Sequence, residues 1–74
     1  MTIIKQGNLQ GQFSGFRNRE TVFVFSDGER WQQDEYRYVD HSVYRPQATV
    51  SQEGGAYYLH VAGVAEKVRV VKRY

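Results

Sequence analysis

The sequence contains no cysteine and a single proline among its 74 residues. Without thiols, the chain has no disulfide to compensate for a thin core, no thiolate zinc site and no iron–sulfur cluster. It also lacks an apolar run approaching the roughly 20 residues that a membrane-spanning helix needs. The N-terminal residues show no apolar run of signal-peptide length. We therefore expect a soluble, cytoplasmic protein with no membrane contact.

Net charge is also low, because ten Lys and Arg side chains face eight Asp and Glu, a balance of +2. Such a balance predicts no strong electrostatic partner by itself. The length predicts one domain, residues 1–74, which buries only about 60% of its unfolded surface. In place of disulfides, the chain has four Phe, one Trp and six Tyr that can fill the core. Rings bury a large area each, so they suit a core with few layers.

Apolar and polar residues mostly alternate, and no segment has the three-and-four spacing of an amphipathic helix. The content of β-branched and aromatic residues is high, as is typical of strands. Short strands recur every 8–12 residues or so, a spacing typical of sandwiches and barrels. The pattern predicts an all-β SH3-like barrel of five or six antiparallel strands. An OB-like barrel is the second choice. It ranks lower because it usually carries a helix, and this sequence does not indicate one.

The clearest element is a hairpin around Asp27-Gly28, the strongest short hairpin signal in the chain. A two-residue turn and a three-residue loop with Gly28 as a bulge predict registers one residue apart. We favour the bulge, which pairs Phe23 with Trp31. The core side of the hairpin then carries Phe23, Phe25 and Trp31.

Glycines and the proline indicate where the remaining strands bend or begin. Residues 9–16 read as one strand bent at Gly11 and Gly15. A long third strand is expected to continue past residue 34 into an irregular crossing, and Pro46 should begin a strand or lie at an edge. Alternation predicts that Ala48, Val50, Tyr57, Leu59, Val61, Val68 and Val70 face inward.

Residues 20–73 contain a DGxxWxQ hairpin from Asp27, a Tyr36-x-Tyr38 pair, a strand after Pro46 and a glycine-punctuated hairpin ending at Gly63. This combination resembles a family of small, uncharacterised bacterial all-β domains. The resemblance implies a stand-alone β domain and transfers no active site, because the family has no assigned activity.

No catalytic or metal-binding pattern stands out. Residues 11–15 have the serine one place away from the centre that a nucleophile elbow requires. Asp40 and His41 are sequence neighbours, so on a strand their side chains point to opposite faces. His41 and His60 alone make a weak metal pair. We expect no cofactor, no metal and no enzymatic activity.

Two surface strips are candidate binding sites. The first combines rings and carboxylates on one predicted strand face, as in surfaces that bind extended peptides; it comprises Tyr36, Tyr38, Tyr44, Asp34 and Asp40. It makes a protein- or peptide-binding module the leading hypothesis, with the partner unidentified. The protein would be a monomer or a weak dimer.

The second strip is basic and supports an alternative function, weak binding of single-stranded nucleic acid. Its residues come from a predicted loop and from the outward side of the C-terminal strand; they are Arg17, Arg19, Lys67, Arg69 and Arg73. Such binding relies on cations for the phosphates, so it would weaken steeply with salt.

Overall fold

The computed structural model describes residues 2–73 and is all-β, as predicted. Eight strands follow in chain order: β1 (Thr2–Asn8), β2 (Gln12–Phe16), β3 (Val22–Val24), β4 (Arg30–Gln33), β5 (Val39–Tyr44), β6 (Gln47–Glu53), β7 (Ala56–Val61) and β8 (Lys67–Arg73). Six of them form an antiparallel sheet in the order β1-β6-β7-β8-β4-β3, and β2 pairs with β5 in a second sheet. The described residues contain no helix, and therefore none long and apolar enough to cross a membrane.

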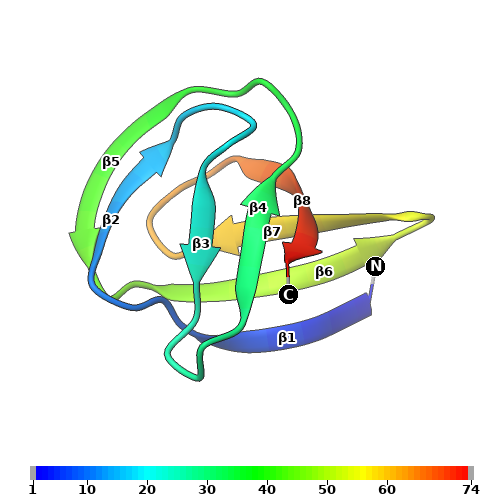
Figure 1. Ribbon diagram of the computed structural model, residues 1–74, viewed down its shortest axis with the longest axis horizontal. Helices are drawn as coiled ribbons and strands as arrows, with labels where there is room; N and C mark the ends of the chain where they lie inside the picture. Colours follow the sequence, from blue (N-terminus) through cyan, green and yellow to red (C-terminus); the bar gives the residue numbers. More distant parts are fainter. Residues whose placement is uncertain (1, 74) are drawn as a thin grey trace.

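The strands do not form the single closed barrel of five or six strands that the spacing predicts. The six-stranded sheet curls until its two end strands, β1 and β3, meet at one end, where the bridge between Leu9 and Phe25 joins them. The small β2–β5 sheet covers the remaining side (Figure 1). The result is a barrel-like shell interrupted between β2 and β3.

The Asp27-Gly28 hairpin has the predicted bulged register, with Phe23 opposite Trp31. Gly28 has φ of 94°, and its amide donates to the carbonyl of Phe25 at 2.9 Å. A residue with a Cβ resists that positive φ, which explains the glycine. The two strands thereby turn their rings to the core.

Apolar side chains from both sheets make one core. As predicted, Ala48, Val50, Leu59, Val61, Val68 and Val70 are buried, and Tyr57 is half-buried against Trp31. Phe16 of β2 meets Phe23 of β3 edge to face at 5.7 Å, and Phe13 packs at 5.9 Å from Phe16. These rings hold the small sheet against the large one without any hydrogen bond between β2 and β3 strands.

Gly15 explains how β2 can lie so close to β5. It sits at a bulge where the register shifts, with φ of 104°. A Cβ there would lie 1.8 Å from the carbonyl oxygen of Val39, a distance that no side chain tolerates. The glycine that the sequence marks as a bend is therefore a point of backbone contact between the two strands.

Trp31 provides the test of this core. Its ring is buried, contacts Tyr57 at 5.5 Å, and donates its indole N–H to Glu29 at 2.8 Å. We expect Trp31→Ala to lower the free energy of unfolding by about 3–5 kcal/mol, as large-to-small core changes do. Urea unfolding followed by circular dichroism measures it. Tyr36→Ala, at a side chain 82% exposed, is the control and should stay within about 0.5 kcal/mol of wild type. Equal stability of the two variants would contradict the assigned core.

Candidate functional site

The outer face of β5 carries an exposed polar and aromatic surface. Along this strand Val39 and Val43 pack toward the core, while the alternate residues Asp40, Ser42 and Tyr44 are exposed. Tyr38 lies directly before the strand. The side chains of Tyr38 and Tyr44 are 65% and 68% exposed, high values for rings. We call Tyr38, Asp40, Ser42 and Tyr44 the tyrosine face.

Residues 34–38 do not continue a strand, so the predicted common face from Asp34 to Asp40 is wrong for that segment. Tyr36 projects into solvent from the loop between β4 and β5. The sequence prediction failed because alternation alone does not indicate where the chain leaves a sheet. Of the five predicted residues, Tyr38, Asp40 and Tyr44 are the ones that belong to the tyrosine face.

The buried side chain of Gln33 makes this segment leave the sheet. Its amide nitrogen donates to the carbonyls of Glu35 and Arg37 at 2.8 and 3.0 Å. Its amide oxygen accepts the backbone N–H of Arg17 at 3.1 Å. Because buried backbone groups need partners, this one side chain folds the β4–β5 loop and fixes the start of the β2–β3 loop. Both loops lie beside the tyrosine face.

Asp34 belongs to a cluster of opposite charges, apart from the tyrosine face. Arg19 contacts one of its carboxylate oxygens at 3.1 Å, and Arg69 contacts the other at 3.6 Å. Arg69 also donates its backbone N–H to Glu35 at 2.9 Å. The structure thus brings together residues that the sequence assigned to two competing sites.

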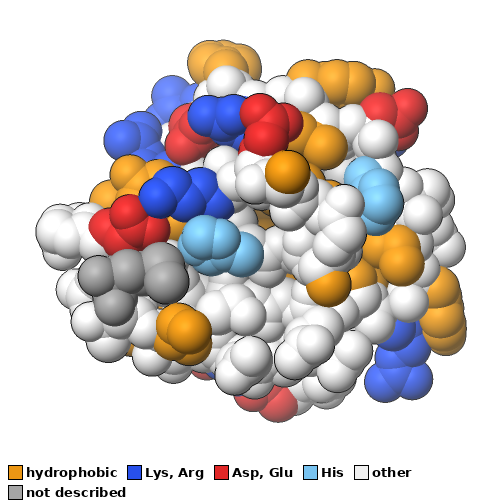
Figure 2. All heavy atoms as spheres, turned by 180° about the vertical axis from the view of Figure 1, so that it is seen from behind, with side chains coloured by type: hydrophobic (Ala, Val, Ile, Leu, Met, Phe, Trp, Pro, Cys, Tyr) orange, Lys and Arg blue, Asp and Glu red, His pale blue; other side chains and the backbone are white. Residues whose placement is uncertain are grey.

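The predicted basic residues do not form one patch. Lys67 pairs with Glu53 at 2.8 Å and lies over the ring of Tyr58 at 4.7 Å from its centre. Arg73 lies at the other end of β8, opposite Arg30. Figure 2 shows basic and acidic side chains interleaved on the face it displays, with no broad area of one sign. The positive field that nucleic acid would meet there is therefore weak.

Arg17 differs from its basic neighbours because its guanidinium contacts a ring and two oxygens that carry no charge. It lies 5.5 Å from the centre of the Tyr38 ring and donates to the Tyr38 hydroxyl at 3.3 Å. It also donates to the carbonyl of Ser14 at 3.2 Å. These contacts hold the Tyr38 ring at one end of the tyrosine face.

Sequence reasoning missed a polar cluster on β6 and β7. The buried hydroxyl of Ser51 donates to Glu53 at 3.3 Å and lies 3.0 Å from Nε2 of His60. The residues are those of a hydrolytic triad, but the order differs, because the acid contacts the serine rather than orienting the histidine. To find this cluster, the pairing of β6 with β7 would have to be known. Ser51 lies opposite Tyr58, so His60 is its diagonal neighbour, two residues along β7.

The two histidines do not share a metal-binding group. They appear at separate places on the surface in Figure 2. Within residues 2–73, no three His, Asp or Glu side chains gather in a way that would hold an ion. His41 instead lies against Gly63, where an added Cβ would come within 3.1 Å of its Nε2.

Comparison of the chain with protein-family models, with curated proteins and with solved structures finds no match. The resemblance to small bacterial domains therefore stays a prediction. The candidate surfaces are argued from this chain's own geometry.

The role of Gln33 can be tested by Gln33→Leu, which keeps the approximate volume and removes the amide. The carbonyls of Glu35 and Arg37 and the amide of Arg17 would lose partners, at a cost of about 1–3 kcal/mol per group left buried and unpaired. We expect lower stability in urea and faster hydrogen exchange at residues 17 and 34–38. Gln32→Leu is the matched control. It removes the same kind of amide from the neighbouring residue, where the side chain is half-buried and makes one hydrogen bond, to the carbonyl of Arg19. Similar exchange rates in the two variants would contradict the assignment.

Two carboxylates that pair with lysines should make the stability of the protein depend on pH. The hydrogen bond from Lys5 lowers the pKa of Asp27 below its ordinary value of 3.8, and that from Lys67 lowers the pKa of Glu53 below 4.5. A carboxyl with a lowered folded-state pKa adds stability above its unfolded pKa and loses it as pH falls through the folded value. We therefore expect the urea midpoint to fall as the pH drops below these two ordinary values.

The matched variant for this test is Lys67→Met, which leaves Glu53 without its lysine. We expect the carboxyl ¹³C resonance of Glu53 to titrate closer to pH 4.5 than in the wild type. The part of the acid-induced fall in the urea midpoint that comes from the Lys67–Glu53 pair should be absent in this variant. An unchanged titration of Glu53 would show that the lysine does not set its pKa.

Proposed function

We propose that this protein is a non-catalytic protein- or peptide-binding module and that the tyrosine face is its contact surface. The observation that carries the proposal is the pair of rings, Tyr38 and Tyr44, about two-thirds exposed at the two ends of β5. Tyrosine offers a large apolar ring and a hydroxyl while losing little side-chain entropy, so it is enriched in binding surfaces. Exposed rings of this kind contribute little to folding, which favours a contact role.

The spacing of the rings suggests an extended partner. Tyr44 lies six positions after Tyr38, which is about 20 Å along a strand at roughly 3.3 Å per residue. A partner segment of about six extended residues would reach both rings and pass Asp40 and Ser42 between them. Arg17 already holds the Tyr38 ring, so less freedom is lost when a partner packs on it.

The alternative, weak binding of single-stranded nucleic acid, has less support. Of its five residues, Arg19, Lys67 and Arg69 already contact carboxylates. A phosphate backbone would have to compete with those carboxylates. A cytoplasmic location and a monomeric or weakly dimeric state belong to the same proposal, and the lack of cysteine supports the first of these.

Selection from a displayed library of random dodecamer peptides tests the proposal. Peptides enriched on the wild-type protein should shift the amide resonances of residues 38–44 in a titration of ¹⁵N-labelled protein. We expect Tyr38→Ala and Tyr44→Ala each to weaken binding by about 30-fold, the loss of a hot-spot ring. Val71→Ala, an exposed apolar residue of β8, is the control and should bind as the wild type does.

Enrichment of no peptide, or shifts that leave residues 38–44 unmoved, would refute the tyrosine face as the contact surface. A decamer of uridylate is the second probe. If it shifts Arg17, Arg19 and β8 at about 20 mM salt, and the shifts disappear near 200 mM salt, nucleic-acid binding would replace the peptide proposal.

A further inference from the structure

Two strands that follow each other in the chain lie side by side without pairing. β2 pairs only with β5, and β3 pairs only with β4. At one end the gap between them is closed by the Leu9–Phe25 bridge and by the bond from the amide of Gln10 to the carbonyl of Val24, at 2.8 Å. At the other end the loop of residues 17–21 joins them. We call this gap between β2 and β3 the seam.

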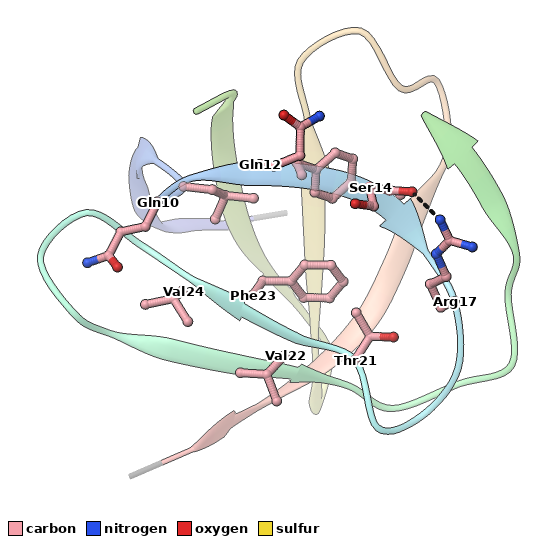
Figure 3. A pocket seen from close by; sticks show the side chains of 11 residues that line it. Gln10, Gln12, Ser14, Arg17, Thr21, Val22, Phe23 and Val24 are labelled. Carbon is pink, nitrogen blue, oxygen red and sulfur yellow. Dashed lines mark hydrogen bonds between the residues drawn. The ribbon is translucent and has the colours of Figure 1, made fainter. Parts of the chain in front are cut away.

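The seam is hollow and has an apolar floor. A cavity of 220 Å³ lies in it, between side chains of both strands (Figure 3). The rings of Phe13 and Phe23, with centres 6.1 Å apart, lie at its base. A cavity of about 150 Å³ with an apolar lining holds benzene. The seam therefore has room for one aromatic or branched apolar side chain.

Backbone groups of both strands face the seam. On either side of β3, the backbone amide of Phe25 donates to the carbonyl of Glu29, and the carbonyl of Thr21 accepts the amide of Gln33. The backbone N–H and C=O groups of the odd-numbered residues therefore point toward β4. In an antiparallel ladder the even-numbered residues then face away, which turns the amides of Val22 and Val24 toward the seam. These groups can pair with the backbone of an added extended chain.

The same reasoning applies to β2. Gly11 accepts the amide of Arg45, on the β5 side, at 2.7 Å. The backbone of Gln12, the next residue, therefore faces the seam. An extended segment lying in the seam would thus find backbone donors and acceptors on both sides.

The positive charge of Arg17, at one end of the seam, indicates that a bound segment would carry a negative charge. Arg17 borders the cavity and points toward Ser14 (Figure 3), whose carbonyl it contacts. Among residues 2–73, no carboxylate forms an ion pair with Arg17, whereas Arg19, Arg37 and Arg69 each form at least one. A guanidinium has five N–H donors, and only two contacts use them here. Arg17 thus retains donors for a carboxylate.

We propose that the seam is a second binding site, which takes an extended polypeptide segment from a partner. An aromatic or branched apolar side chain of that segment enters the cavity over Phe13 and Phe23. A carboxylate two residues further along, on the same side of the extended chain, pairs with Arg17. The site uses the other edge of β2 and does not require the tyrosine face.

The test uses the acetylated, amidated pentapeptide TFTET, whose Phe and Glu have this spacing, with TSTET and TFTQT as matched peptides. Titration into ¹⁵N-labelled protein should shift residues 12–17 and 21–24 saturably with TFTET. We expect TFTQT to bind about tenfold more weakly, the loss of one charge-assisted contact. TSTET should give no saturable shift.

Protein variants separate the two sites. Arg17→Gln should make TFTET bind no better than TFTQT, and Lys67→Gln, the same change of charge at a residue paired with Glu53, should leave the tenfold preference intact. Tyr44→Leu removes the ring at the other end of the tyrosine face, away from Arg17, and should also keep the preference. A preference that survives Arg17→Gln overturns the assignment of the carboxylate site.

Three further results would overturn the seam as a peptide site. The first is TFTET shifting only residues 38–44, which would support the tyrosine face alone. The second is a change of the seam resonances on dilution of the free protein, which would mean that a second copy occupies the seam. No saturable shift at millimolar TFTET also refutes it, and leaves the proposal for the tyrosine face standing.

Discussion

At the end of β4 the chain leaves the sheet, and the side-chain amide of Gln33 makes hydrogen bonds to the backbone of the loops there. The side chain of Gln33 is buried, and three backbone groups in two different loops depend on it for hydrogen bonds. Polar groups removed from water need such partners, because leaving one unpaired costs more than a surface contact gains. The positions of Arg17 and Tyr38, which serve the two candidate surfaces, both follow from this amide.

The rings of three phenylalanines impose the second constraint. Phe13 and Phe16 on β2 meet Phe23 on β3, so the two sheets are joined by packing rather than by strand pairing. Gly15 keeps β2 tight against β5, where any side chain would collide with Val39. The shell therefore stays open between β2 and β3, although its core is continuous. The seam is a consequence of how the core is filled.

Sequence reasoning succeeded where side chains alternate between core and solvent. The bulged register around Gly28 could be predicted because only that register places Phe23, Phe25 and Trp31 on one side. β1 was missed because it lies at a sheet edge, pairs only with β6 and exposes Ile3 and Ile4. An edge strand of this kind carries no inward apolar series, so its pattern does not indicate a strand.

The candidate surfaces were less predictable, because they depend on contacts between residues far apart in the chain. Exposure of Tyr38 and Tyr44 was predicted because rings and carboxylates are mixed along one predicted strand face. The pairing of Asp34 with Arg19 and Arg69 was not, because it requires knowing that the β2–β3 loop and β8 meet beside residue 34. The seam had no sequence signal, since adjacent strands joined by a short loop ordinarily pair with each other.

Arg17 contacts both candidate surfaces. Its guanidinium holds the ring of Tyr38 on one side and the carbonyl of Ser14, at the seam, on the other. A carboxylate bound at the seam would draw on the same guanidinium that orients Tyr38. Any change in the affinity of one surface caused by a ligand on the other must then be matched in the reverse direction, because such coupling is reciprocal. One arginine would in this way connect two binding surfaces on opposite edges of a five-residue strand.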